Sequence, residues 1–261
     1  MKSKRVPRAV REQQMLDAAV RIFARRGYRA ASMDEIAESA GVSKPLVYLY
    51  LHSKEELFTA CIRREAQSLV TAIRSAVELG ATADRQLWGG LYGFFSHTAA
   101  HPDGWAVLHV QARTHGEPFA REVAAMRAEI VELVTRQIES AAREAGCASE
   151  SAVWGTTALA QALVGAAESL ADWAGSGTAA GGGPEAGAGP AAGSAAGPGA
   201  AEGTGAAEGR GAAEGTDGGT GSGGPEGRSA KEAAATLMNF AWAGLENLIR
   251  GEGWSPGRTT G

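Results

Sequence analysis

Histidine, serine and acidic side chains gather near residue 100, where their types and spacing could support metal binding or nucleophilic catalysis. His97 and His101 are four residues apart, a spacing that can hold a metal on one helical face, and Asp103 and His109 follow. A histidine near a helix C-terminus is explained more simply by its attraction to the helix dipole. Ser96 precedes His97, but sequence neighbours do not face each other on a helix, and no third group is evident. We therefore expect no metal site, no cofactor and no enzyme activity.

The charge of the chain is divided unevenly along its length. Residues 1–31 carry nine Lys and Arg side chains against Glu12 and Asp17, a net charge of +7. Residues 1–60 have a net charge of +4, whereas residues 61–261 have a net charge of −8. A basic head on an acidic body indicates that the head meets a polyanion, with a solvated charged helix end as the alternative.

One segment differs in composition from the rest of the chain. Residues 175–228 hold 21 of the 37 glycines and contain no aromatic residue, Leu, Ile, Val or Met. Such a segment cannot bury enough apolar surface to offset its ordering entropy, so we predict that it is disordered. The remaining residues are numerous and apolar enough to bury one good core.

Cysteine content and hydropathy bound the class of protein. Cys61 and Cys147 are too few and too scattered for a disulfide framework or a Cys-based zinc site. No apolar run reaches the roughly 18 residues that a membrane span needs. We expect a cytoplasmic protein with no membrane partner.

Helical patterns dominate the first 60 residues. Apolar side chains fall on one face over residues 8–26, and Gly27 is a typical C-terminal stop. A Ser-x-x-Glu capping box at residues 32–35 opens a short helix that ends at Ala40. Gly41 then turns the chain.

A second short helix and a long helix follow this turn. Ser43 can cap a helix that carries Pro45 in its first turn and runs to about Tyr50. Residues 53–56 form a second capping box, which starts the long helix. The apolar stripe of the long helix consists of Phe58, Ile62, Leu69, Ile73 and Val77. Two short helices around a glycine turn have helix-turn-helix proportions.

Four motifs in this region resemble a known family. They are Gly27-Tyr28-x-x-x-Ser32-Met33-Asp34-Glu35-Ile36-Ala37, Ala40-Gly41-Val42-Ser43-Lys44, Leu46-Val47-Tyr48-Leu49-Tyr50 and Ser53-Lys54-Glu55-Glu56-Leu57. Their order and spacing over residues 10–60 resemble the DNA-binding domain of TetR-family transcriptional regulators. The family often has small and polar residues just after the lysine, where this chain has Pro45 and Leu46.

The second helix of a helix-turn-helix enters the major groove of DNA, and its first residues meet the base edges. The candidate DNA-binding residues are Ser32, Ser43, Lys44, Pro45, Leu46, Tyr48, Leu49, His52 and Lys54. Helical spacing turns Val47, Tyr50 and Leu51 toward the core, and for Tyr50 core packing is the favoured of two interpretations. We expect both lysines to meet phosphates and Leu46 to offer only an apolar contact, such as one with a thymine methyl.

Other roles in the head rest on the resemblance or on helix ends. The resemblance implies that Tyr48 contacts a phosphate through its hydroxyl. Ser32 can cap its helix, present its hydroxyl to the DNA backbone, or do both. Arg5 and Arg8 are expected to add salt-dependent affinity through a flexible arm.

The acidic body also reads as helical. Apolar periodicity predicts helices over residues 84–100, 103–113 and 117–144, one from about residue 149 and one from Ser229. All six tryptophans lie in this part. The predicted effector pocket consists of Trp88, Tyr92, Phe95, Trp105, His109, Arg113, Met126 and Trp154. Each aromatic residue could instead be plain core, but the resemblance implies a cavity for a small-molecule inducer, here with an apolar or aromatic effector as the expectation.

Small residues on the last two helices predict a homodimer. The candidate interface consists of Leu159, Ala162, Gly165, Ala166, Ser169, Leu237, Phe240, Ala241, Gly244, Leu245 and Leu248. Small side chains let helices approach closely, and the resemblance implies a four-helix bundle between two protomers. The glycine-rich insert between these helices adds only about 2 kcal/mol of loop-closure entropy, so the interface should tolerate it. Its length also permits the last helix to dock on the partner chain, as a hypothesis.

The sequence as a whole predicts an all-α, dimeric, ligand-responsive regulator, most simply a repressor that a small-molecule effector releases from a (pseudo)palindromic operator. We expect a basic arm at residues 1–9, a helix-turn-helix domain at 10–56, and an effector-binding and dimerisation domain at 57–174 and 229–254. The disordered insert, 175–228, interrupts the last of these. Two alternatives remain: a non-specific architectural DNA-binding protein, and an interaction module without operator binding.

Overall fold

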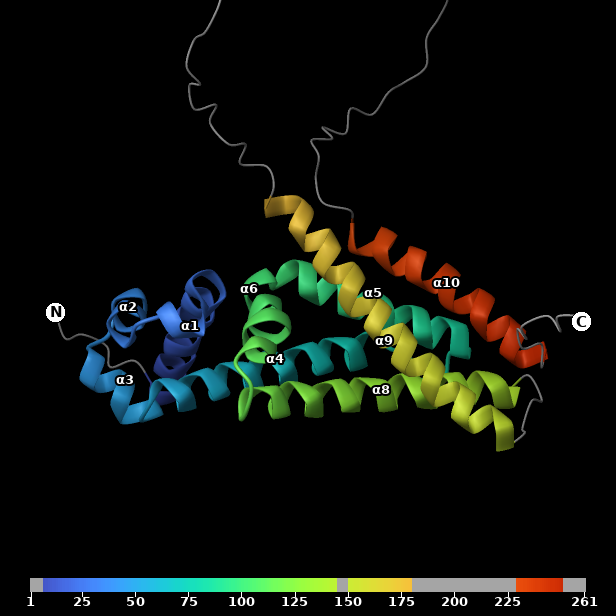
Figure 1. The fold of residues 1–261 in the computed structure, drawn as a ribbon, viewed down its shortest axis with the longest axis horizontal. Helices are drawn as coiled ribbons and strands as arrows, with labels where there is room; N and C mark the ends of the chain where they lie inside the picture. The colour runs from blue at the N-terminus through green and yellow to red at the C-terminus, as the bar shows by residue number, and fades with distance from the viewer. Residues whose placement is uncertain (1–6, 145–149, 180–228, 251–261) are drawn as a thin grey trace, which may run out of the picture.

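The computed structural model describes residues 7–144, 150–179 and 229–250, with side chains described throughout except at 150–154, 176–179 and 243–250. Every regular element within these ranges is a helix (Figure 1). Figure 1 shows a small group of helices at the N-terminal end and a larger bundle beside it, with α4 (Lys54–Ala76) running from one into the other. The all-α prediction is therefore confirmed.

The small group at the N-terminal end, called the head below, consists of α1 (Arg8–Ala30), α2 (Met33–Ser39) and α3 (Lys44–Leu51). Gly27 interrupts the helical backbone with φ 77° and ψ 161°, after which one more helical turn reaches Ala30. The sequence predicted the break but not this extra turn. Positive φ at Gly41, 65°, makes the tight connection between α2 and α3, a conformation that costs glycine no steric strain.

Both predicted capping boxes place their serine as expected. The Glu35 backbone N–H donates to Ser32 Oγ (3.1 Å), and the Glu56 backbone N–H donates to Ser53 Oγ (3.0 Å). Such a cap stabilises a helix start by about 1 kcal/mol. Ser43 differs: it occupies the N-cap position of α3 without a side-chain capping bond, so its hydroxyl is not used by the helix.

The larger bundle, called the body, begins with α5 (Ala83–Ala100) and the continuous helical run of α6 (Pro102–Ala106), η1 (Val107–Gln111) and α7 (Ala112–Thr114). The middle of this run, η1, is a π-helix rather than the plain α-helix that the sequence predicted over 103–113. The long helices α8 (Phe119–Glu144), α9 (Glu150–Ala179) and α10 (Ala230–Arg250) complete the body. Figure 1 shows α9 crossing over α8, with α10 alongside α9 and α5.

The predicted disordered insert begins too early. Residues 175–179 continue α9, although Gly175 and Gly177 are weak helix formers. A helix whose preceding turns are packed, here through buried Ala167 and Ala171, can extend past the end that propensity alone would set. The rest of the predicted insert, residues 180–228, lies outside the described residues.

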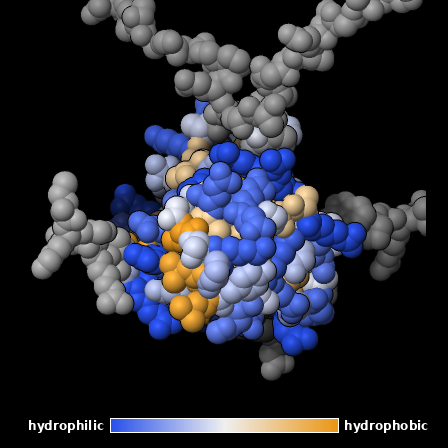
Figure 2. All heavy atoms as spheres, turned by 90° about the vertical axis from the view of Figure 1, so that its left-hand side faces the viewer, coloured by the Kyte–Doolittle hydropathy of each residue, from blue (hydrophilic) through white to orange (hydrophobic). Residues whose placement is uncertain are grey.

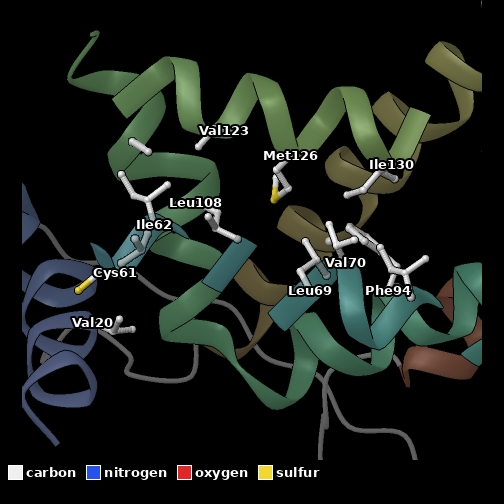
Figure 3. Packing of buried hydrophobic residues seen from close by; sticks show 14 of the residues in the cluster. Val20, Cys61, Ile62, Leu69, Val70, Phe94, Leu108, Val123, Met126 and Ile130 are labelled. Atoms are coloured by element: carbon white, nitrogen blue, oxygen red, sulfur yellow. The ribbon is translucent and has the colours of Figure 1, made fainter. Parts of the chain in front are cut away.

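One continuous apolar core runs through head and body (Figure 3). Phe23, Ile36 and Val47 of the head are fully buried, together with Phe58 near the start of α4. Figure 3 shows the core continuing along α4 from Cys61 and Ile62 toward Leu69 and Val70, where side chains from α5 and α8 meet them. The two parts are therefore not separated by a polar boundary.

Glycines bring α5 unusually close to the end of α4. A Cβ placed on Gly93 would lie 2.7 Å from the Ala76 Cβ, and one on Gly89 would overlap with the backbone carbonyl oxygen of Ala76. Gly90, the next residue, is also buried but has room for a methyl group: a Cβ there would make only ordinary van der Waals contacts, the closest at 3.7 Å. Gly89 and Gly93 thus set the distance between the two helices.

We predict that Gly89→Ala lowers the free energy of unfolding by about 1–3 kcal/mol, because the backbone of α4 must move to admit the methyl group. The matched control is Gly90→Ala, which should leave stability unchanged or raise it by up to about 1 kcal/mol through helix propensity. Chemical denaturation followed by circular dichroism measures both. Equal stabilities for the two variants would contradict the close-packing interpretation.

Candidate DNA interface and effector cavity

The outer face of α3 presents a stripe of side chains at positions i, i+3, i+4 and i+7. The stripe consists of Pro45, Tyr48, Leu49 and His52, all of which are exposed. Leu49 is 67% exposed and Tyr48 39%, whereas Val47 and Leu51 fill the inner face. Leu46 is half-buried at the edge of the stripe. Helical spacing thus places Pro45, Tyr48 and Leu49 on the outer face as predicted, and His52 follows α3 as its C-cap residue.

Lys44 begins α3 with its ammonium group held by a neighbour. Its Nζ donates to Asp34 Oδ2 at 2.9 Å, across the turn from α2, and both side chains are exposed. The hydrogen bond to the Asp34 carboxylate, with the attraction of its charge, raises the pKa of Lys44. Lys44 therefore stays charged at neutral pH, but an approaching phosphate would have to compete with Asp34.

Lys54 is engaged within the head. Its Nζ donates to the backbone carbonyl of Arg29 (3.0 Å) and lies 4.9 Å from the centroid of the Tyr28 ring. Partial burial lowers the pKa of Lys54. The Lys54 side chain thus already connects the start of α4 to the end of α1. To contact a phosphate, as expected, it would have to give up this hydrogen bond.

The other candidate residues of the head lie at its surface or at the edge of its core. Ser32 and Ser43 are exposed, Ser32 with its Oγ capping α2. Tyr50 is half-buried against the core, and the Arg8 guanidinium lies 4.9 Å from the centroid of its ring. Arg8, expected in a flexible arm, is therefore the first residue of α1 and packs on an aromatic face.

A cavity of about 460 Å³ lies in the body between α4, α5, α8 and α9. Its walls are mostly aliphatic and aromatic, with Leu69, Leu91, Phe94 and Ile130 among them. Charged and polar side chains also contribute to the lining: Arg74, Gln86, Arg136, Gln137, Ser140, Arg143 and Glu168. Arg74 pairs with Glu129, and Arg136 with Glu132. A volume of this size is in the range of small-molecule sites.

The sequence analysis predicted only some of the residues that line this cavity. Of the eight residues expected in an effector pocket, Trp105 and Met126 line the cavity. Trp88, Tyr92 and Phe95 do not, because the face of α5 that borders it carries Leu87, Gly90, Leu91 and Phe94 instead. The residues of α5 that were chosen for their size thus lie on its other faces. The side chain of Trp154 lies outside the described residues.

The displaced aromatic residues make contacts of their own. Trp88 stacks on Tyr92 with ring centroids 6.3 Å apart, and Tyr92 is 44% exposed. Phe95 is buried, and its ring meets that of Phe94 edge to face at 5.1 Å. These contacts assign Phe95 to the core.

His109 and Arg113 lie on the other side of the cavity wall, in a polar surface hollow between the α6–α7 run, α8 and α9. His109 Nδ1 lies 2.6 Å from Asp172 Oδ2, and the Trp105 indole N–H donates to Asp172 Oδ1 at 2.9 Å. The indole of Trp105 also stacks on the His109 ring, with centroids 4.8 Å apart. Trp105 therefore has one part in the cavity wall and another fixed to α9.

Glu168 of α9 lines both the cavity and the hollow. Arg127 Nε lies 3.2 Å from Glu168 Oε1, and Arg113 Nη1 lies 3.7 Å from Glu168 Oε2. The Glu168 side chain is only 14% exposed, and a carboxylate buried to this extent is tolerated because the two arginines pair with it.

A contact that the sequence did not reveal joins the body to the head. Gln111, the last residue of η1, accepts a hydrogen bond from the Tyr28 backbone N–H at its Oε1 (3.3 Å), beside the kink at Gly27. The Tyr28 ring stacks on Phe58 (4.8 Å) and packs against Phe119 of α8 (5.0 Å). Only the position of Tyr28 directly after Gly27 could have drawn attention to it; nothing in the pattern around Gln111 did.

The predicted dimer interface divides into two sets. Ala162 and Ser169 are exposed on α9, and Gly165 and Ala166 are half-exposed. Phe240 of α10 is 64% exposed. Leu237 and Ala241, in contrast, are buried within the protomer, so they cannot meet a partner chain in this fold. Leu159 is half-buried, and the side chains of Gly244, Leu245 and Leu248 lie outside the described residues.

Two of the histidines near residue 100 lie against each other. The rings of His97 and His101 stack with centroids 4.3 Å apart, and no group of three or more His, Cys, Asp or Glu side chains within the described ranges is arranged to hold a metal. Burial, and then the neighbouring His101, lower the pKa of His97. No helix in the described part of the chain is long and apolar enough to cross a membrane.

Comparison with known proteins covers both parts of the molecule. Residues 15–61 match the family model described as bacterial regulatory proteins, tetR family, and residues 83–184 match the model described as tetracyclin repressor-like, C-terminal domain. A TetR-like transcriptional regulator from Rhodococcus sp. RHA1, known as a crystal structure, is 33% identical with a TM-score of 0.65. That match covers 93% of this chain and 99% of the other.

Two curated relatives match over shorter stretches. The HTH-type transcriptional activator FasR of Mycolicibacterium smegmatis is 38% identical over 104 residues, 40% of this chain and 48% of the relative. The fatty acid metabolism regulator protein of Bacillus subtilis is 30% identical over 74 residues, 28% of this chain and 38% of the relative. The matched region thus spans less than half the length of either relative. With family models matching head and body and a full-length structural relative, the chain belongs to the TetR family of DNA-binding transcriptional regulators, which are not enzymes.

Proposed function

We propose that the chain is a homodimeric repressor that binds a two-fold-symmetric operator and leaves it when a small molecule fills the cavity. The observation that carries this proposal is the segment Trp105–Gln111. At one end Trp105 lines the cavity, and at the other Gln111 holds the Tyr28 backbone at the base of the head. A single short stretch of chain therefore touches both the effector cavity and the DNA-binding part.

The DNA interface of this proposal is the outer stripe of α3 together with the start of α2. Leu49 would enter the major groove, and the phosphates on either side would be met by Tyr48, Lys44, Ser43 and Ser32. The absence of a side-chain capping bond at Ser43 supports this role, because its hydroxyl remains available. Lys54 would contribute to DNA binding indirectly, because its bond to the Arg29 carbonyl holds the start of α4 against α1.

The dimer of this proposal forms on the outer face of α9 and α10. The exposed small residues Ala162 and Ser169 would let the partner helix approach closely, and Phe240 would be covered by it. Trp173, 52% exposed on the same helix as Ala162, extends this apolar surface. Two heads related by a two-fold axis would then meet two half-sites.

The effector of this proposal is an apolar molecule with a negatively charged end. Leu69, Leu91 and Ile130 supply apolar walls, and Arg143, with no acidic partner among the described side chains, could meet an anionic group. The Bacillus subtilis relative is named for fatty acid metabolism, and fatty-acid-derived molecules have this chemistry. Aromatic anions would satisfy the same walls.

Release follows from the contacts of Trp105. An effector that displaces the indole would disturb its bond to Asp172 and shift η1, to which Gln111 belongs. A π-helix carries one extra residue in its turn, so its conversion to α-helix would change the position of Gln111. A coupling of about 1–3 kcal/mol is typical of allosteric proteins, and operator DNA must lower effector affinity by the same factor.

Footprinting of the purified protein on DNA flanking its gene, at two salt concentrations, tests the proposal. We expect protection of a short two-fold-symmetric site that survives competitor DNA. Diffuse protection that vanishes at moderate salt would favour a non-specific architectural protein instead. In vitro transcription from the protected promoter should fall on addition of protein. A rise would show an activator, the function named for the Mycolicibacterium smegmatis relative.

We predict opposite effects on operator affinity from the two partners of the Lys44–Asp34 ion pair. Lys44→Ala should weaken binding and reduce the slope of log affinity against log salt by about one phosphate contact. Asp34→Asn should strengthen binding, because the lysine is freed and a repelling carboxylate is lost. Lys231→Ala, an exposed lysine on α10, is the matched control and should change neither quantity. Affinities that are equal for Lys44→Ala and the wild type would contradict the docking.

We predict that Gln111→Met separates effector binding from DNA release. Anilinonaphthalene sulfonate, an aromatic anion that fluoresces in apolar sites, serves as the probe. Its binding should be unchanged in the variant, whereas its effect on operator affinity should fall by at least about five-fold, because the bond to the Tyr28 backbone is gone. Gln67→Met, on the exposed face of α4, should behave as the wild type. Full release by the probe in Gln111→Met would exclude this route.

A further inference from the structure

The groove-facing stripe of α3 is unusual in its chemistry. Two of its four members, Pro45 and Leu49, have side chains with no hydrogen-bonding group. Figure 2, which looks at the head end of the molecule, shows an apolar patch within a mostly hydrophilic surface. Leu49, at 67%, is among the most exposed large apolar residues of the described chain.

Leu49 does not serve the core of the head. Val47 is fully buried and Leu51 is 7% exposed, so these two residues already supply the inner face of α3. An exposed leucine on the helix that enters the groove is stabilised only when a partner covers it. Its apolar surface is therefore available for the complex with DNA.

Side chains that read bases by hydrogen bonds are scarce on this helix. Arginine and lysine recognise guanine with paired bonds, asparagine and glutamine recognise adenine, and acidic residues accept from cytosine. The outer stripe of α3 contains none of these types, and Lys44 at its start is held by Asp34. Apolar contact with the C5-methyl group of thymine is the form of direct readout that a leucine and a proline can supply.

We propose that Leu49, together with Pro45, selects the operator by packing against thymine methyl groups in the major groove. Each half-site then contains thymines whose methyl groups, rather than their hydrogen-bonding atoms, are recognised. Tyr48, between them on the stripe, supplies a hydroxyl to the backbone and does not read the methyl. This inference rests on the proposed operator binding and names its chemical basis.

The test removes single methyl groups from the DNA. A duplex recovered by selection from random-sequence DNA with the full-length protein is resynthesised with deoxyuracil in place of one thymine at a time. We expect one or two positions in each half-site at which this change weakens binding about four-fold, the loss expected for one buried methyl group. Replacement of cytosine by 5-methylcytosine elsewhere provides the control for a general effect of base modification.

Variants assign the methyl contact to the side chain. Leu49→Ala should bind the thymine duplex more weakly than the wild type does, and the change from thymine to deoxyuracil at the sensitive position should no longer matter. Tyr48→Phe is the matched control: its affinity should fall equally on both duplexes, so that its sensitivity to the methyl group persists. Circular dichroism at the temperature of the assay confirms that each variant is folded.

The outcomes separate this inference from the proposed function. A sequence-specific complex that is indifferent to every methyl group, or equally sensitive in Leu49→Ala and the wild type, would overturn the methyl readout and leave operator binding intact. Failure to recover any preferred sequence would instead overturn the proposed function itself.

Discussion

Helix α4 is shared by the head and the body, and the arrangement of both depends on it. Its first turns bury Leu57 and Phe58 in the core of the head, and its last turns carry Leu69 and Ile73 into the wall of the cavity. Phe58 and Ile73 are fifteen positions apart, which corresponds to about 22 Å along a continuous helix. In the proposed function, a ligand in the cavity and a head bound to DNA would therefore both act on this helix. The apolar core is continuous along α4 from the head into the body, so a displacement of one part would be transmitted to the other.

Charged residues in the middle of α4 fix how the neighbouring helices meet it. Glu65 is only 7% exposed, and Arg64 joins it (2.7 Å) while also reaching Asp17 of α1 (2.7 Å). A buried carboxylate is tolerated only when it is paired, so the position of α1 is tied to that of this pair. A Cβ on Gly104 of α6 would overlap with the Glu65 carboxylate. The helical run from α6 through η1 to Gln111 is thus fixed against α4 at Gly104. A shift of η1 would therefore move Gln111 relative to α4.

Features set by local interactions could be predicted from the sequence, and those set by packing could not. Ser32, Ser53 and Gly41 determine helix starts and a turn through contacts within a few residues, so their roles were visible in the sequence. The cavity is different: Phe94 lines it and Phe95 does not, because the glycines at 89 and 93 dictate which face of α5 meets α4. Likewise, Leu237 and Ala241 share the apolar periodicity of a dimer helix, but that face packs inside the protomer. Gln111 joins Tyr28 across 83 positions of sequence, a distance over which no periodicity gives information.

Both lysines of the candidate DNA interface already have partners within the head. Lys44 is shared with Asp34 and Lys54 with the Arg29 carbonyl, so both lysines would give up an existing partner to meet a phosphate. Apolar contacts from Leu49 would add affinity that salt does not screen and that only the right bases provide. An effector can shift the balance between the DNA-bound and the free state only by the difference between its own affinities for the two states. In the proposed function, Leu49 would therefore supply the specificity for the operator, whereas Lys44 and Lys54 would add phosphate contacts only by leaving the partners that they have within the head.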